Sequence, residues 1–263
     1  MTPKGKKVAV IGAGIMGTII IDALFKFFPK KDICIYDVHP EKLRGIKNEH
    51  RSVSVSVNAS DLSIADYVVL AIKPQDFSNF KAKVKSNAVA ISIMAGVSTS
   101  FIKKQLGVKK VIRAMPNAPA RYGQGFTVWL ASNEITRSDK LFAKKLFGEL
   151  GVEREIKSEG QIAKVTAVTG SGPAYIFSSL QSYLKAVEAL GFDQQTAHEM
   201  IMKVLEGALA MLKNNGDFNG LIKQIASKGG TTEAALKQFK KDNLDGIWQK
   251  AILVAYRRAK KIR

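Results

Sequence analysis

Cysteine is almost absent from this chain, which has one cysteine, Cys34, among 263 residues. A single cysteine excludes a disulfide within the chain and any metal site built from a cluster of cysteines. Because Cys34 falls inside the apolar run Ile33–Tyr36, we expect it to be a small residue of the hydrophobic core. We expect no bound metal ion.

Long uninterrupted apolar runs are also missing. A membrane-spanning helix needs about 20 consecutive apolar residues, and no run in this sequence approaches that length. The basic segment Met1–Lys7 leads directly into an apolar strand, without the separate apolar segment and cleavage site of a secretory signal. These absences predict a cytoplasmic protein that does not bind a membrane.

Acidic residues are few, since 22 of them stand against 41 Lys and Arg and leave a net charge of +19. A chain this basic raises the alternative of a nucleic-acid-binding protein. The basic residues are dispersed, however, and the one dense run is Arg257–Arg263. No helix-turn-helix or zinc-finger pattern accompanies them. We interpret the charge as a solvated surface that attracts anionic ligands, and we expect no nucleic-acid partner.

A glycine-rich turn stands near the start of the chain. The apolar run Val8–Ile11 predicts a buried strand, and a G-x-G-x-x-G pattern then opens a helix. In such a turn the first glycine permits the bend, the second lets the backbone approach a pyrophosphate, and the third lets the helix pack on the strand. The helix N-terminus binds the anion. The predicted cofactor-binding residues of this turn are Gly12, Gly14, Ile15, Met16 and Gly17.

An acidic residue supports a dinucleotide site. The second apolar run ends in Asp37, twenty residues after Gly17. At that distance a carboxylate is placed to bind the ribose hydroxyls of the adenosine half, and it repels a 2′-phosphate. We therefore predict that NADH is used at least as well as NADPH. The neighbouring basic residues His39, Lys42 and Arg44 favour the opposite preference.

Strand and helix patterns alternate through the first half of the chain. This alternation predicts an α/β fold with a doubly wound, mostly parallel sheet of the Rossmann type. The carboxyl ends of such strands line the ligand crevice, which places Ala71, Lys73, Pro74 and Asn117 on the cofactor side. The expected strands are Val8–Ile11, Ile33–Tyr36, Val53–Val57, Tyr67–Ala71, Ala88–Ile93, Val111–Ala114, Gly125–Leu130 and Val152–Ile156.

The second half of the chain has a helical period almost throughout. We therefore expect a dinucleotide-binding domain over residues 1–157 and an all-helical domain for dimerisation and substrate binding over residues 158–263. Two glycines and a proline in Thr169–Tyr175 predict a kink in the first long helix. The expected helices are Gln161–Leu190, Gln194–Asn214, Asn219–Ala226, Thr232–Lys240 and Leu244–Ile262.

A second glycine loop, Ser227–Thr232, leads into one of these helices. A glycine loop before a helix N-terminus suits a carboxylate. Ordinary helix capping by the threonines is the alternative interpretation.

Six motifs together resemble those of the pyrroline-5-carboxylate reductase family, over essentially the whole chain. The resemblance implies a Rossmann domain followed by a helical domain that dimerises, with an active site near the dimer interface, and it allows a higher assembly of dimers. The chain departs from the family at Lys228, which stands where relatives carry proline. The motifs are Ile11–Gly17, Ala71–Gln75, Ser92–Val97, Arg113–Ala120, Gly170–Tyr175 and Ser227–Thr232.

The resemblance also implies an activity, the reduction of 1-pyrroline-5-carboxylate to L-proline by hydride transfer from NAD(P)H, which is the last step of proline biosynthesis. It implies that the Thr232 hydroxyl, the catalytic group, contacts the ring nitrogen. The backbone N–H groups of Gly229, Gly230 and Thr231 are the candidates to hold the substrate carboxylate. The expected substrate-binding residues are Ser227, Gly229, Gly230, Thr231 and Thr232.

Two alternatives stay open at this point. The β-hydroxyacid and 6-phosphogluconate dehydrogenases share the glycine-rich opening and a helical second domain, but they place a lysine four residues after a helix glycine, whereas Gly172 is followed there by Ile176. A non-catalytic dinucleotide-binding protein would bind NAD(P)H without turnover.

Overall fold

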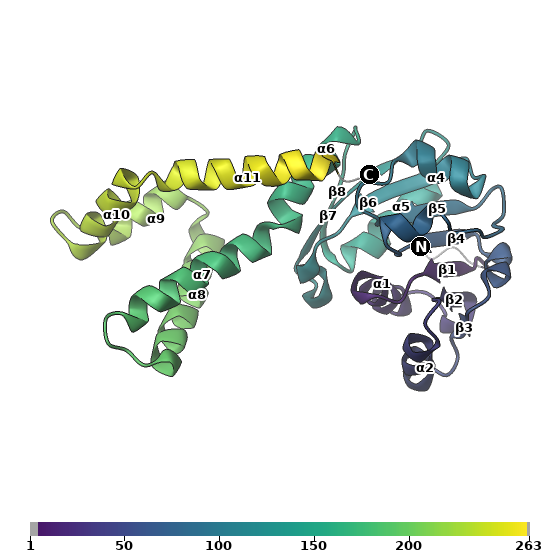
Figure 1. Cartoon of the computed structure of the whole chain (residues 1–263), viewed down its shortest axis with the longest axis horizontal. Helices are drawn as coiled ribbons and strands as arrows, with labels where there is room; N and C mark the ends of the chain where they lie inside the picture. Colours follow the sequence, from purple (N-terminus) through teal and green to yellow (C-terminus); the bar gives the residue numbers. More distant parts are fainter. Residues whose placement is uncertain (1–4, 262–263) are drawn as a thin grey trace. The chain divides into compact units, whose positions relative to one another are not determined.

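The computed structural model describes residues 5–261 and separates into two compact units (Figure 1). The sheet unit comprises the described residues up to Gly170 and those from Tyr256 onward, and the helical unit comprises Ser171–Ala255. The start of the basic leader and the last two residues of the C-terminal basic run lie outside the described residues.

Eight strands form one sheet in the order β3-β2-β1-β4-β5-β6-β7-β8. Strands β1 to β6 are parallel, whereas β7 runs antiparallel to β6 and parallel to β8. The chain winds outward from β1 in one direction and then returns to β4 on its other side, which confirms the predicted doubly wound sheet. The strands are β1 Val8–Ile11, β2 Ile33–Tyr36, β3 Ser54–Ser56, β4 Tyr67–Leu70, β5 Val89–Ser92, β6 Lys110–Met115, β7 Gly125–Ala131 and β8 Gly151–Glu155.

Every residue of β1, β4 and β5 is buried, because helices cover both faces of the central strands. One apolar cluster joins the sheet to α1 and α5, and another joins the opposite face to α3 and α4. This packing leaves the strand ends as the place where polar groups reach a ligand. The helices of this part are α1 Ile15–Phe25, α2 Pro40–Glu49, α3 Pro74–Phe77, α4 Thr99–Leu106 and α5 Arg137–Gly148.

The expected kink takes the form of a π-helical turn at Thr166–Gly170, between α6 and α7. Pro173 lies at the start of α7, where its missing N–H costs no helical hydrogen bond. The contacts place α6 and this turn in the sheet unit, so the two compact units divide after Gly170. The domain boundary expected after residue 157 stays a prediction. The remaining helices are α6 Gly160–Val165, α7 Gly172–Glu188, α8 Gln194–Asn215, α9 Phe218–Ile225, α10 Thr231–Lys241 and α11 Leu244–Lys261.

None of the described helices is both long and apolar enough to cross a membrane. In the helical unit α7 and α8 lie side by side (Figure 1).

A buried carboxylate ties α5 to the amino ends of two strands. Asp139 is 5% exposed and accepts hydrogen bonds from the Tyr67 hydroxyl and the Lys110 ammonium group, both at 3.1 Å. It also forms a capping box with Thr136 at the start of α5. Burial by itself raises the pKa of Asp139, but the hydrogen bonds from Thr136, Lys110 and Tyr67 outweigh burial and hold this pKa below the ordinary 3.8.

Asp139→Asn should lower the free energy of unfolding by about 2–3 kcal/mol, because Lys110 loses its partner and the cap is weakened. Folding lowers the Asp139 pKa, so its contribution is present above the unfolded pKa and is lost as the pH falls through the folded pKa. Urea denaturation at one protein concentration, at pH 7 and at successively lower pH, measures both effects.

A matched control is Glu134→Gln, which removes the exposed ion pair with Lys103 on the same unit. This control should leave the denaturation midpoint unchanged. An Asp139→Asn penalty that does not shrink as the pH is lowered would contradict the role of the carboxylate charge.

Candidate functional site

The glycine-rich turn lies at the carboxyl end of β1, packed against the end of β4. Gly12 has φ +102°, and a side chain there would bring its Cβ to 2.7 Å from the Ala71 carbonyl oxygen. A Cβ on Gly17 would overlap the Gly12 carbonyl group. A Cβ on Gly14, by contrast, would meet nothing within 4 Å. Gly12 and Gly17 are therefore needed for packing, whereas Gly14 leaves open space at the N-terminus of α1.

A cavity of about 700 Å³ lies beside this turn, lined by Gly14, Asp37 and Lys73 among others. The space suits an extended anion, because the α1 N-terminus adds backbone N–H donors and a positive dipole end. Ile15 is 76% exposed, and Met16 is half-buried against the core below. These features fit the dinucleotide predicted from the sequence.

Asp37 lines the cavity and also shapes the turn. Its Oδ2 accepts a hydrogen bond of 2.8 Å from the Ala13 N–H, and its Oδ1 accepts one of 2.9 Å from the His39 N–H. The Lys42 ammonium group lies 3.5 Å from Oδ2. The buried carboxylate therefore holds the glycine turn in place, and its contact with the ribose hydroxyls stays a prediction.

The end of β4 continues into the short helix α3. The Ala71 N–H donates to the Ile11 carbonyl oxygen at 2.8 Å, which extends the contact with β1 by one residue. Lys73 is exposed and lines the first cavity, whereas Pro74 lines a second one. Gln75 lines both, so the two cavities are neighbours.

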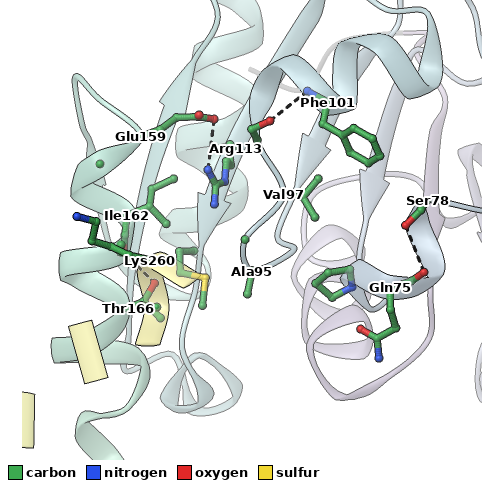
Figure 2. A pocket seen from close by; sticks show the side chains of 17 residues that line it. Gln75, Ser78, Ala95, Val97, Phe101, Arg113, Glu159, Ile162, Thr166 and Lys260 are labelled. Atoms are coloured by element: carbon green, nitrogen blue, oxygen red, sulfur yellow. Dashed lines mark hydrogen bonds and ion pairs between the residues drawn. The ribbon is translucent and has the colours of Figure 1, made fainter. Parts of the chain in front are cut away.

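The second cavity, of about 620 Å³, lies between the start of α4, the end of β6 and the start of α6 (Figure 2). Arg113 of β6 is 8% exposed, and its Nη1 lies 3.3 Å from Oε1 of Glu159. The same Glu159 oxygen accepts hydrogen bonds from the Thr99 N–H, at 2.7 Å, and from the Thr99 hydroxyl. Burial raises the pKa of Glu159, but the Thr99 hydrogen bonds and Arg113 outweigh burial and hold this pKa below the ordinary 4.5.

This ion-paired group was missed by the sequence analysis, which gave Arg113, Glu159 and Thr99 no role. The available signal was an arginine inside the otherwise largely apolar strand Lys110–Met115. The spacing in sequence did not reveal the partner, because Glu159 comes from a different element beyond two further strands.

Asn117, predicted to contact the cofactor, has both ends of its carboxamide bonded to the backbone. Its Nδ2 donates to the Thr169 carbonyl oxygen at 2.9 Å, and its Oδ1 accepts from the Phe126 N–H at 2.8 Å. The residue is 9% exposed. These bonds give Asn117 a role in holding the β6 end against the π-helical turn, and the predicted cofactor contact stays a prediction.

The glycine loop predicted to bind a carboxylate lies in the helical unit, before α10. Gly229 has φ +75° and its N–H donates to Oε2 of Glu233 at 2.7 Å. The Gly230 N–H donates to the Ser227 carbonyl oxygen at 3.0 Å. Two of the predicted donors thus have partners in the chain. The N–H groups of Thr231, where α10 begins, and of Thr232 belong to the first helical turn, which has no acceptors within the helix.

The Thr232 hydroxyl has no hydrogen-bond partner among the described residues, and no side chain of the N-cap residue caps α10. Within the loop it is Glu233 that accepts a hydrogen bond from the backbone, at the Gly229 N–H, and its other oxygen lies 3.1 Å from the Lys237 ammonium group. Helix capping therefore does not account for Thr232 in this structure.

Comparisons with known proteins cover both units. A family model described as pyrroline-5-carboxylate reductase dimerisation matches residues 159–262, and one described as NADP oxidoreductase, coenzyme F420-dependent, matches residues 7–96. The pyrroline-5-carboxylate reductase of Haemophilus influenzae is 32% identical over 98% of this chain and 97% of its own length.

Solved structures give the same result. The pyrroline-5-carboxylate reductase of Coxiella burnetii superposes with a TM-score of 0.84 at 30% identity, over 98% of each chain. The 1-pyrroline-5-carboxylate reductase of Streptococcus pyogenes gives a TM-score of 0.86 at 26% identity, over 97% of this chain and 98% of its own. The sheet with its open glycine turn and the helices that follow it are matched by these relatives from end to end. The chain therefore belongs to the pyrroline-5-carboxylate reductase family.

Proposed function

We propose that this chain reduces 1-pyrroline-5-carboxylate to L-proline with NAD(P)H, and that it does so in the cytoplasm. The observation that carries the proposal is the open position at Gly14, beside a cavity of about 700 Å³ that Asp37 and Lys73 also line, in a chain of this family. The fold by itself supports many oxidoreductases, so the substrate rests on the family.

The sheet unit holds the cofactor in this proposal, and the cofactor when bound supplies the hydride. The first N–H groups of α1 bind the pyrophosphate, which approaches the backbone at Gly14. Asp37 holds the turn by its hydrogen bond with the Ala13 N–H, and it accepts hydrogen bonds from the ribose hydroxyls at the edge of the cavity. Lys73 lines the same cavity, with a positive charge toward the phosphates.

The start of α10 holds the carboxylate of the imine. Thr231 and Thr232 offer backbone N–H groups there, and Gly229 joins them when Glu233 releases its N–H. The free Thr232 hydroxyl serves as the hydrogen-bond partner of the ring nitrogen. An unperturbed alcohol is too weak an acid to protonate an imine by itself, so the hydroxyl orients the ring and relays a proton.

We also propose that the functional form is a homodimer. No residue of α7 is buried, although the helix carries Ile176 and Phe177, which are 49% and 69% exposed. A largely apolar groove of about 590 Å³ lies between α7 and α8, lined by Leu184 and Met202 among others. A second copy would remove these surfaces from water. Light scattering of the intact chain tests this, and an active monomer at micromolar concentration would contradict it.

The activity is tested by following the loss of NADH or NADPH absorbance when 1-pyrroline-5-carboxylate is added to the purified chain. We expect turnover with both cofactors, and NADH to be used at least as well as NADPH because Asp37 disfavours a 2′-phosphate. Binding of NAD(P)H without turnover would favour the non-catalytic alternative, and a kcat/KM at least about tenfold higher with NADPH would contradict the assignment of Asp37.

Thr232→Ala should lower kcat/KM by about ten- to a thousandfold, which corresponds to about 1.4–4 kcal/mol of transition-state stabilisation. The melting temperature should not change, because the hydroxyl caps no helix. Thr232→Ser keeps the hydroxyl and should retain most of the activity.

The matched control is Thr136→Ala at the start of α5, where the threonine does form a capping box. This variant should melt at a lower temperature and keep its kcat/KM. If Thr232→Ala behaves in the same way as Thr136→Ala, then Thr232 has a structural role only.

Gly14→Ala should raise the Kd of NAD(P)H by at least about tenfold while leaving the fold intact, because the added methyl group has space in the chain but stands where the pyrophosphate approaches. Isothermal titration and thermal melting measure the two effects. Gly17→Ala should instead lower the melting temperature, since its Cβ meets the Gly12 carbonyl group.

Gly148→Ala is the control, because this exposed glycine also has open space around it but lies at the end of α5. It should change neither property for the worse. Unchanged NAD(P)H binding in a folded Gly14→Ala variant would rule out a pyrophosphate at this turn.

A further inference from the structure

Arg113 is buried with most of its hydrogen-bonding capacity unused. A guanidinium group carries five N–H donors, yet Glu159 is the one acceptor in contact with it in the described part of the chain. Its Nε is buried and has no hydrogen-bond partner among residues 5–261. Buried donors in folded proteins are nearly always paired. Since Arg113 lines the second cavity, its missing acceptor is expected to arrive with a ligand.

The charge around Arg113 restricts what that acceptor is. Glu159 is held in its ionised form by Thr99 and by Arg113 itself, so the guanidinium already has a full negative charge beside it. A second carboxylate on the same guanidinium would be repelled by Glu159 at short range. A neutral carbonyl oxygen accepts the same hydrogen bonds without that repulsion.

The position in the fold identifies the group that carries such an oxygen. The second cavity lies at the ends of β5 and β6, whereas the first lies at the ends of β2, β1 and β4, on the other side of the sheet's midpoint. Gln75 lines both cavities. A dinucleotide in a doubly wound sheet lies across this point, with one nucleotide on each side. With the adenosine half beside Asp37, the nicotinamide half enters the second cavity, and its ring carries one neutral carboxamide.

We propose that Arg113 donates a hydrogen bond to the carboxamide oxygen of the nicotinamide ring, and that Glu159, fixed by Thr99, is the positioning residue that orients the guanidinium. This rests on the proposed cofactor site and deepens it. Figure 2 shows the guanidinium joined to Glu159 among the residues that line the cavity. A carboxamide held at this point fixes the rotation of the ring, and therefore the face that it presents to the imine.

The test compares two ligands that share the adenosine half of the cofactor. Isothermal titration of the full chain with NADH and with ADP-ribose, which lacks the nicotinamide ring, separates contacts to the ring from contacts to the rest. Arg113→Gln should weaken NADH binding by about ten- to a hundredfold, the range of a lost hydrogen bond from a charged donor. The Kd of ADP-ribose should stay within about twofold.

Two further variants guard against a general loss of structure. Arg113→Lys keeps a positive charge for Glu159 but not the planar fork, so it should fold and still lose part of the NADH affinity. Glu159→Gln leaves Arg113 in place without its orienting charge and should weaken NADH binding by less than Arg113→Gln does. Lys103→Gln, in the exposed pair with Glu134, is the control for loss of one positive charge and should bind both ligands normally.

A cofactor analogue identifies the contacted atom. Thionicotinamide adenine dinucleotide replaces the carboxamide oxygen with sulfur, a weaker acceptor, so its binding should be less sensitive to Arg113→Gln than that of NAD⁺. Equal sensitivity of NAD⁺ and the analogue, equal weakening of NADH and ADP-ribose, or unchanged NADH binding in folded Arg113→Gln would each overturn the proposal.

The source of the acceptor is tested separately with L-proline, titrated into the complex with NAD⁺. If Arg113→Gln weakens proline binding and not NAD⁺ binding, the acceptor is the carboxylate of the imino acid and the proposal is wrong. Since all of these readouts are binding constants, a chain that binds NADH but does not turn over 1-pyrroline-5-carboxylate would refute the proposed function without affecting this test.

Discussion

The close packing of the glycine turn against β4 is the constraint on which the rest of the sheet unit depends. Gly12 touches the Ala71 carbonyl group and Gly17 touches Gly12, so α1 starts directly above the point where the chain crosses from one half of the sheet to the other. Asp37, which directly follows β2, reinforces this arrangement by accepting a hydrogen bond from the Ala13 N–H. The first cavity owes its position to this turn, because Gly12 and Gly14 line it together with the end of β4.

Buried charge appears at both ends of the sheet, under the same physical rule. Removing a carboxylate from water raises its pKa, and Asp139 at the amino ends and Glu159 at the carboxyl ends both overcome this with several hydrogen bonds. The two clusters differ in whether every buried donor has a partner. Asp139 and its partners bond to one another and hold α5, whereas Arg113, which lines a cavity, keeps a buried Nε without a partner in the described part of the chain. Unused buried donors are a signal of ligand binding that satisfied clusters do not give.

The helical unit leaves much of its apolar surface uncovered within the chain. Its helices are amphipathic, but α7 and α10 bury no residue within the chain. Such helices are stable only when another surface covers their apolar sides. The glycine loop before α10 therefore lies on a unit whose own packing is incomplete, which supports the proposed homodimer.

The sequence by itself determined the fold class, the glycine turn and most element positions, because these follow from short-range patterns of apolar residues, glycine and proline. The α/β sheet, the helical half and the break before Pro173 were all visible in this way. Only the tertiary structure decided which polar groups pair: that Asn117 bonds to the backbone at Phe126 and Thr169, that Glu233 accepts a hydrogen bond from the Gly229 N–H, and that Glu159 pairs with Arg113. These pairings join residues through the packing of separate elements or through side-chain direction, neither of which is encoded in local spacing.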